Sequence, residues 1–470
     1  MRRKKGEVVP KPVVYAGVAQ VDITPPMGVE MCGYGPYEKR VCTDVLDPLY
    51  ARSLWLQCGE ERLLIVTLDL CSVCAEVRDD VVQQVCHEVG LSQESVLIAA
   101  SHTHSGPSTQ RLIGWGERDA PYLGELRQRL VKACLEARAE AVPARMGACR
   151  QRVHGVGVNR EQPAFGLLDT AAQLLRVDRA DGTPLAVLYN FAAHGVVRYP
   201  FTSRVSADWP GLAAAYIKAS LGTEVVLFLQ GCGGNINAHE MSFARDDVVM
   251  RQQVADMRTG DVAIRLCDQI LPALRGIRTS SEAELCSVWR TVKLPCSPPD
   301  AEDLRRVIAE NQTPADRMTL AELRPLHERI RDESEQEREW RFARYRVDAA
   351  SHQLGLLEKR QTHVEAPVQI MRLGEAVLVG WPGEIYVELG LEIRQRSPFP
   401  LTFVAGFAND TVGYIPTPAA YESQGKANEF GKYPTTLTPQ IYGNLPFRGD
   451  VGRVLVEDTL DLLNQLHSPR

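Results

Sequence analysis

The sequence lacks the features that mark membrane, secreted and nucleic-acid-binding proteins. No apolar run reaches the roughly 20 residues that a membrane-spanning helix needs. The basic N-terminus, Arg2-Arg3-Lys4-Lys5, is not followed by the apolar segment of a secretory signal. Positive charge is not in excess, because 53 Lys and Arg stand against 59 Asp and Glu and give a net charge of -6. We therefore expect a cytoplasmic protein with no membrane span and no nucleic-acid partner.

Cysteine is present but follows no regular framework. The 12 cysteines are scattered, and Cys71-Ser72-Val73-Cys74 has no second CxxC pair that would complete a zinc knuckle. In a chain with no secretory signal, such cysteines are typically reduced and buried. Redox or metal use of this CxxC segment is the less favoured alternative. With 44% hydrophobic and 24% charged residues, the rest of the composition is that of an ordinary folded protein.

Apolar runs and helical patterns alternate along much of the chain. Runs that end in a small, polar or kinked segment predict strands at 63–68, 96–100, 185–193, 225–229 and 376–379. Helices are expected between some of them, at 76–89, 120–141 and 211–221. Such alternation indicates an α/β core, in which functional groups gather where strands end.

Other segments depart from that pattern. Residues 13–23, 286–294 and 366–373 alternate as antiparallel strands do, so we predict a mixed α/β (α+β) fold with mixed β-sheets flanked by helices. Residues 297–362 are highly charged and predict a helical insertion with a solvent-exposed helix pair, a lid or oligomer contact being the alternative. We expect one domain over 13–470 that includes this insertion, preceded by a basic tail over 1–12.

Two histidines one residue apart are the most informative local feature. His102 and His104 follow the apolar run 96–100, and Gly106-Pro107 then breaks the extended structure. Side chains alternate along an extended backbone, so both imidazoles are predicted to point to the same side at the end of a strand. They could meet a metal or a reacting carbonyl there. The alternative is a pair of hydrogen-bonded loop histidines.

A series of short motifs resembles, in the same order, the neutral/alkaline non-lysosomal ceramidases. The matching segments are Ala16 to Pro26, Asp47 to Arg52, Ser101 to Pro107, Asn159-Arg160, Ala193-His194, Ser206 to Gly211, Gln230 to Asn237, Pro382-Gly383-Glu384 and Gly413 to Thr417. Each string alone is weak, but their joint order from about residue 13 to 465 is specific. The resemblance implies a fold like the catalytic domain of those enzymes.

The resemblance also implies one zinc ion held by two histidines, a glutamate and a tyrosine. By motif these ligands are His102, His194, Glu384 and Tyr414. Imidazole nitrogen and carboxylate oxygen suit zinc, and a catalytic zinc keeps one position open for water or substrate. Taken singly, these residues could be a core histidine, a turn glutamate and a packing tyrosine; the ordered set favours the metal site.

Further residues are implied around the metal. His104 would donate to a developing oxyanion or move a proton. Arg160 resembles the family's active-site arginine and would hold a substrate oxygen, with a structural ion pair as the alternative. Asp208 would orient a ligand histidine, or else cap a helix.

Two departures from the ceramidases concern the substrate. Asn237 occupies the place of the serine in their Gly-Asp-Val-Ser-Pro-Asn string, as in bacterial relatives with Gly-Asp-Ile-Asn-Pro. Asparagine cannot be an alkoxide nucleophile, but it can hydrogen-bond a carbonyl or a water. The sequence also ends at Arg470, before any C-terminal immunoglobulin-like domain, and Lys426 stands where an aromatic residue is common. Together these departures favour a small polar substrate over a sphingolipid.

The resemblance therefore implies a metal-dependent hydrolase that uses Zn²⁺ and an activated water, and its departures favour the amide (acyl) bond of a small polar molecule as the bond cleaved. Nickel, iron or manganese could occupy the same ligands. A lactonase, an esterase or a hydrolase of carbohydrate derivatives would use the same site. A true ceramidase and a non-catalytic zinc-stabilised binding protein are further alternatives, and a homo-oligomer is left open.

Overall fold

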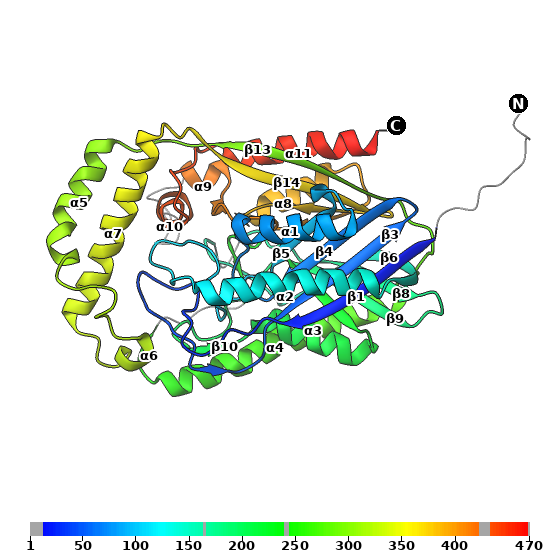
Figure 1. Ribbon diagram of the computed structural model, residues 1–470, viewed down its shortest axis with the longest axis horizontal. Helices are drawn as coiled ribbons and strands as arrows, with labels where there is room; N and C mark the ends of the chain where they lie inside the picture. The colour runs from blue at the N-terminus through cyan, green and yellow to red at the C-terminus, as the bar shows by residue number, and fades with distance from the viewer. Residues whose placement is uncertain (1–12, 163–165, 239–243, 423–432, 469–470) are drawn as a thin grey trace, which may run out of the picture.

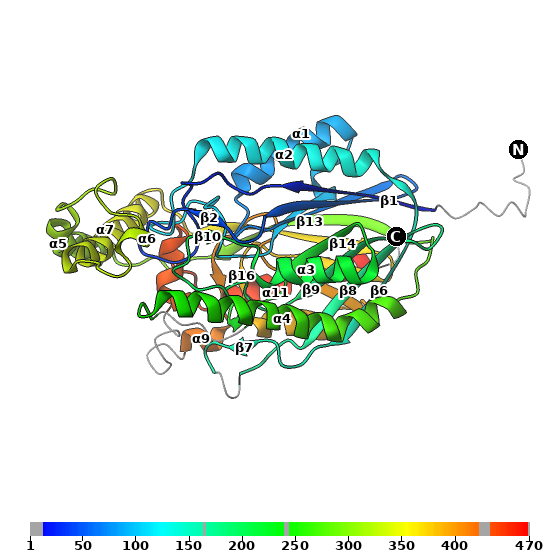
Figure 2. The ribbon, with the colours of Figure 1, turned by 90° about the horizontal axis from the view of Figure 1, so that it is seen from below.

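The computed structural model describes residues 13–162, 166–238, 244–422 and 433–468. These residues form four layers in the order helix, sheet, sheet, helix (Figures 1 and 2). The predicted tail over 1–12 and Lys426 lie outside the described residues. No helix in the described part of the chain is both long and apolar enough to cross a membrane.

The larger sheet has eight strands and mixed direction. In spatial order they are β11 (Val225–Gln230), β9 (Pro184–Phe191), β8 (Ala171–Arg179), β6 (Val142–Arg152), β1 (Val14–Asp22), β3 (Tyr50–Cys58), β4 (Glu61–Leu68) and β5 (Val96–Ala100). The edge strands β11 and β5 each pair in parallel with their neighbour, and the strands between them are antiparallel. The prediction of a mixed sheet is confirmed.

The smaller sheet has four strands, β13 (Leu285–Pro295), β14 (His363–Leu373), β15 (Ala376–Gly380) and β17 (Leu401–Ala405). It packs against the larger sheet, as alternation along β4 shows. Leu63 and Ile65 lie in one core cluster with Met371 and Phe403 of the smaller sheet, while Leu64 lies in a cluster with helices on the opposite face. Because both faces of β4 are buried, its sequence is a continuous apolar run.

Helices cover the outer faces of both sheets. The larger sheet is covered by α1 (Ala75–Val89), α2 (Ala120–Ala139), α3 (Asp208–Leu221) and α4 (Val248–Gly276), and the smaller by α8 (Val387–Arg396) and α11 (Val451–His467). Figure 2 separates α1 and α2 on one side from α3 and α4 on the other. The three predicted helices α1, α2 and α3 are confirmed, whereas α4 was not predicted.

The charged segment forms α5 (Ala301–Ala315), α6 (Leu326–Arg329) and α7 (Glu335–Glu358), which project from one end of the molecule (Figure 1). Ser334 and Glu337 form a reciprocal capping box that begins α7. The helices are therefore present as predicted. However, α7 is not simply a solvated helix, because Trp340 and Arg341 are buried.

A buried ion network joins these helices to the loop that precedes β2 (Asp44–Val45). Both Glu38 and Glu333 lie within ion-pair distance of the same three guanidinium groups, those of Arg245, Arg329 and Arg341. Burial alone would raise the pKa of Glu38, but the three arginines outweigh it and hold that pKa below its ordinary value. The network fixes the loop against the insertion.

Short elements complete the fold near the ends of the long strands. They are β7 (Val158–Asn159), β10 (Arg204–Val205), β12 (Ile236–Asn237), β16 (Glu384–Ile385), β18 (Tyr414–Ile415), α9 (Pro418–Glu422) and α10 (Thr438–Ile441). The two-residue strands pair as β10 with β2, β12 with β7, and β16 with β18. Three of them, β12, β16 and β18, carry predicted site residues.

Candidate metal centre

The four predicted ligands come from both sheets. His102 follows β5 and His194 follows β9, both of the larger sheet. Glu384 follows β15 of the smaller sheet, begins β16, and is paired in register with Tyr414, the first residue of β18. All four are buried, with Glu384 and Tyr414 each only 4% exposed. The topology thus brings together residues that lie up to 312 positions apart, from 102 to 414.

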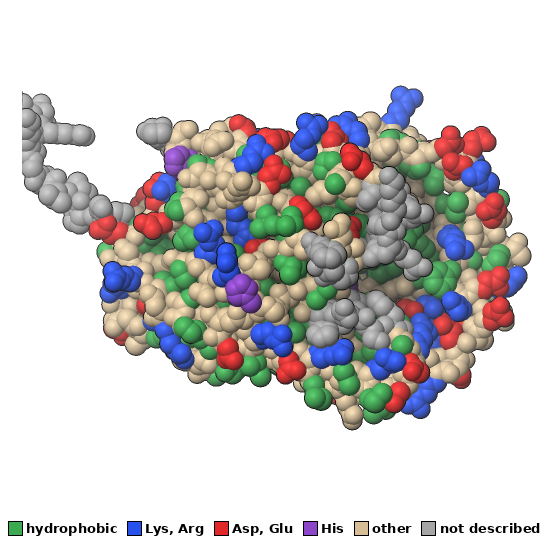
Figure 3. Space-filling model, turned by 180° about the vertical axis from the view of Figure 1, so that it is seen from behind, with side chains coloured by type: hydrophobic (Ala, Val, Ile, Leu, Met, Phe, Trp, Pro, Cys, Tyr) green, Lys and Arg blue, Asp and Glu red, His purple; other side chains and the backbone are tan. Residues whose placement is uncertain are grey.

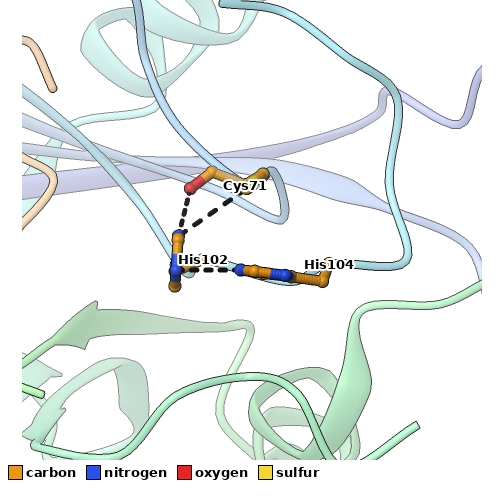
Figure 4. Close-up of side chains that lie close together, drawn as sticks. All are labelled: Cys71, His102 and His104. Atoms are coloured by element: carbon orange, nitrogen blue, oxygen red, sulfur yellow. Dashed lines mark hydrogen bonds between the residues drawn. The ribbon is translucent and has the colours of Figure 1, made fainter. Parts of the chain in front are cut away.

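The histidine pair reaches the site by a route different from the one predicted. β5 ends at Ala100, and His102 has a left-handed backbone with φ 64° rather than an extended one. The strand-alternation argument was therefore wrong for this segment. The turn nevertheless places Nε2 of His104 3.0 Å from Nε2 of His102 (Figure 4).

Backbone carbonyls fix the tautomers of both candidate ligand histidines. Nδ1 of His102 lies 2.7 Å from the carbonyl oxygen of Cys71 (Figure 4). Nδ1 of His194 lies 2.6 Å from the carbonyl oxygen of Gly233. A carbonyl only accepts, so each Nδ1 must carry the hydrogen and donate it. Each Nε2 is then left with a lone pair.

Three acceptor atoms face one another: Nε2 of His102, Nε2 of His194 and Oε2 of Glu384. Oε2 of Glu384 lies 3.0 Å from Nε2 of His194 and 3.5 Å from Nε2 of His102. Ligands of a tetrahedral zinc with bonds of about 2.0–2.1 Å are about 3.3 Å apart. Burial lowers the pKa of His194 to about 4, so a proton is a poor bridge at neutral pH. The donor set therefore fits a divalent cation.

Three residues that sequence reasoning missed support the ligands. The hydroxyl of Tyr442 donates to Oε1 of Glu384 at 2.5 Å. The ring of Phe407 stacks on that of His102 with centroids 3.9 Å apart. Cys71 contributes its backbone carbonyl, which no side-chain pattern could have indicated. Tyr442 and Phe407 lie in no motif, so the sequence carried no signal for them.

The thiol of Cys71 makes a second group of candidate ligands with His102 and His104 (Figure 4). Its Sγ lies 3.7 Å from Nδ1 of His102, the atom already bonded to the Cys71 carbonyl. A hydrogen bond with Cys32, together with burial, raises the pKa of the Cys71 thiol well above its ordinary value. A neutral thiol is a weak ligand, so the group containing His194 and Glu384 is the stronger one.

Arg160 and Asn237 lie beside the ligands. β7 and β12 pair antiparallel, which places Arg160, the residue after β7, next to the loop before Asn237. Nη2 of Arg160 donates to the hydroxyl of Tyr414 at 2.8 Å and to the carbonyl of Gly234, and lies 3.4 Å from Nε2 of His194. Oδ1 of Asn237 is buried and has no hydrogen-bond partner among the described residues. Oδ1 of Asn237 is thus left without a described partner beside the candidate ligands, whereas Arg160 is bonded to Tyr414 and Gly234.

Asp208 takes a different place from the one expected of an imidazole partner. It begins α3 with φ 56°, and its carboxylate accepts hydrogen bonds from the backbone N–H groups of Val197, Arg198 and Trp209. The indole of Trp209 in turn donates to the carbonyl of His194 at 2.9 Å. Asp208 therefore fixes the turn after His194 and the start of α3. This role is closer to helix capping than to orienting a ligand histidine.

Two glycines allow close approach of neighbouring segments at the centre. A Cβ on Gly234 would lie 2.5 Å from the carbonyl oxygen of Glu384. A Cβ on Gly33, whose φ is 116°, would lie 2.5 Å from Nδ1 of His104. Any larger residue would displace the ligand loop or His104.

The face opposite that of Figure 1 is hollowed beside the segments drawn in grey (Figure 3). Lys and Arg side chains and Asp and Glu side chains are interspersed over this face. No large field of one sign dominates it, in keeping with the net charge of -6.

The layered fold and the buried histidine, glutamate and tyrosine side chains define an α/β protein with a candidate metal centre. Residues 15–226 match the family model described as neutral/alkaline non-lysosomal ceramidase, N-terminal. The chain is 23% identical over 479 residues to a neutral ceramidase of Mycobacterium tuberculosis, a match that covers 88% of this chain and 74% of that protein. These two matches support the resemblance of this chain to the neutral/alkaline non-lysosomal ceramidases.

Solved structures agree on the fold. A neutral ceramidase from Pseudomonas aeruginosa matches with a TM-score of 0.70 and 18% identity, over 97% of this chain and 74% of that one. A ceramidase complexed with C2 matches with a TM-score of 0.67 and 18% identity, over 97% of this chain and 75% of that one. The predicted ceramidase-like fold is confirmed.

Proposed function

We propose that this protein is a zinc-dependent hydrolase that cleaves an amide (acyl) bond of a small polar substrate with an activated water. This proposal is carried by three buried acceptor atoms that face one another. Oε2 of Glu384 lies 3.0 Å from Nε2 of His194 and 3.5 Å from Nε2 of His102. Tyr414, paired with Glu384 in register, would complete the ligand set. Zinc, when bound, would polarise a carbonyl and lower the pKa of a water to about 7.

His104 would stabilise negative charge on the reacting carbonyl oxygen. Burial, and then the neighbouring His102 and His194, lower the pKa of His104 well below its ordinary value. The neutral ring carries one N–H, and its Nε2 lies 3.0 Å from Nε2 of His102. A donor fixed at the edge of the ligand set can meet charge that develops in the transition state.

Asn237 and Arg160 would position the substrate. The unpartnered Oδ1 of Asn237 can accept a hydrogen bond from the N–H of a bound amide or from the attacking water. Arg160 donates to the Tyr414 hydroxyl and so holds that side chain toward the centre. These polar groups, with His104, support a polar substrate. They also support attack by water, because asparagine cannot serve as the nucleophile.

The test is metal content followed by a substrate panel. Purified wild-type protein is expected to hold about one zinc ion per chain. His194→Ala and Glu384→Gln should lose it, while Glu392→Gln, on the exposed side of α8, should retain it. The panel would contain N-acyl amino acids and other short N-acyl amines, short lactones and esters, and a short-chain ceramide.

The outcomes separate the readings of the site. Zinc-dependent hydrolysis of the short amides supports the proposal. Zinc-dependent turnover of lactones or esters alone would identify the protein as a lactonase or esterase. A preference for the ceramide would contradict the proposed small polar substrate. No bound metal after zinc is supplied would contradict the metal centre itself.

A further inference from the structure

We propose that α4 pairs antiparallel with α4 of a second copy of this chain, as the seam of a two-fold dimer. α4 lies on the outside of the molecule, along the lower edge in Figure 1 and in the outer helical layer of Figure 2. Five of the large hydrophobic side chains exposed in the described residues belong to this single helix, including Met257 at 70% and Ile264 at 48% exposure. The inner face is independently apolar, since Val262 and Leu266 are buried against the core.

The exposed side chains are spaced as in a coiled coil. Met250, Val254, Met257, Asp261 and Ile264 follow one another at intervals of four, three, four and three residues. This alternation keeps them on one side of a helix, where they form a narrow ridge. Apolar residues scattered singly over a surface need no explanation, but a continuous ridge marks a contact site.

Charge favours a second copy of this chain as the occupant. Asp261 lies on the ridge and Arg258 lies beside it, three residues earlier, and among the described residues no ion pair or hydrogen bond of either side chain is found. If two α4 helices run antiparallel and cross between Thr259 and Gly260, Arg258 of each copy faces Asp261 of the other. In the same register Val254 lies one residue from the position opposite Ile264 of the second copy. A surface that is complementary to itself is what an isologous two-fold interface requires.

The seam is small, so the dimer should be concentration-dependent. The ridge from Met250 to Ile264 covers 14 helical steps, about 21 Å at 1.5 Å per residue. A contact of this length falls at the lower end of specific interfaces, below about 1,200 Å² of total buried area. α4 contributes none of the candidate metal ligands, so the dimer is independent of the proposed chemistry.

The test is sedimentation velocity of the full chain over a range of concentrations. The wild type is expected to shift from 52.1 kDa toward twice that mass as concentration rises. Met257→Asp and Ile264→Asp should each raise the dimer dissociation constant by about thirtyfold or more, as loss of a central apolar anchor does. Met27→Asp, at a residue 54% exposed outside α4, is the matched control and should leave dimerisation unchanged.

A charge exchange tests the register. Arg258→Asp and Asp261→Arg should each weaken the dimer, and the double variant should restore it because both pairs are re-formed across the seam. Circular dichroism and zinc content should be unchanged in all variants. The proposal is overturned if the wild type stays monomeric at every concentration, if the dimer survives Met257→Asp, or if monomers bind phosphatidylcholine vesicles through the ridge instead.

Discussion

Two of the buried polar clusters among the described residues balance their charges in opposite ways. In the network beside α6 and α7, Glu38 and Glu333 are compensated by three arginines of the same chain. At the candidate metal centre, two imidazole lone pairs and the Glu384 carboxylate face one another instead. The network is complete as folded, whereas under the proposed function the centre would be complete only with a bound cation. A buried polar cluster therefore indicates a ligand site when its acceptors face other acceptors. A cluster in which donors face acceptors needs no ligand.

The largest expected effect comes from breaking the self-compensated cluster. Glu38→Gln leaves three buried guanidinium groups around one carboxylate and should cost about 3–5 kcal/mol of unfolding free energy, roughly 10²–10⁴-fold in the folding equilibrium. Urea denaturation measures it, with Glu457→Gln in the exposed pair with Arg396 as a control that changes little. Zinc content of the folded variant should equal that of the wild type. Lost zinc with unchanged stability would contradict the comparison.

The pH dependence of this cluster has a definite sign. The folded-state pKa of Glu38 is held below its ordinary value of 4.5. The ionised Glu38 carboxylate therefore contributes its full share to folding stability above pH 4.5. The contribution is lost as pH falls from 4.5 through the lower folded-state pKa. The difference in stability between wild type and Glu38→Gln should therefore be constant near neutrality and shrink below pH 4.5. A difference that grew on acidification would exclude the assigned cause.

A smaller effect, confined to turnover, is expected from Gly33→Ala. The new Cβ would lie 2.5 Å from Nδ1 of His104, which must then move. Displacing a reacting group by about 1 Å can cost about 10²-fold in rate. The kcat on the best amide substrate should fall while zinc content is retained. Gly28→Ala is the matched control, because it has a positive φ of 90° and nothing within 4 Å; an equal loss there would trace the effect to backbone strain.

The smallest effect is expected from Tyr442→Phe, which removes the hydrogen bond to Oε1 of Glu384. Loss of a group that orients a metal ligand typically lowers metal affinity by about 10–100-fold. Competition with a zinc chelator measures the change. Tyr122→Phe removes another buried hydroxyl bond, to the carbonyl of Ile23, and should leave zinc affinity unchanged. Equal affinities for all three proteins would show that Tyr442 does not act on the ligand.

Much of this arrangement could be predicted where side-chain identity carries the information. The continuous apolar runs of β4, β5 and β11 predict buried strands. The runs are continuous because both faces of the sheet are covered. His102, His194, Glu384 and Tyr414 each sit in a motif whose order along the chain is recognisable. Pairing of β16 with β18 then explains why two of them, thirty residues apart in the chain, are neighbours in space.

What could not be predicted depends on backbone atoms or on surfaces. The carbonyls of Cys71 and Gly233 set the histidine tautomers, and any residue would supply the same atom. The left-handed backbone of His102, with φ 64°, departs from the extended conformation that the preceding strand predicts. α4 escaped prediction because it is apolar on its inner face and along its outer ridge, which blurs the single stripe expected of a surface helix.

The origin of the four ligands on two different sheets has a thermodynamic consequence. His102 and His194 follow strands of the larger sheet, while Glu384 and Tyr414 follow strands of the smaller one. A cation held by all four would bridge the two sheets. Its binding free energy would then add to the free energy of unfolding of the whole domain. Removal of that cation would lower the stability of the packing between the two sheets.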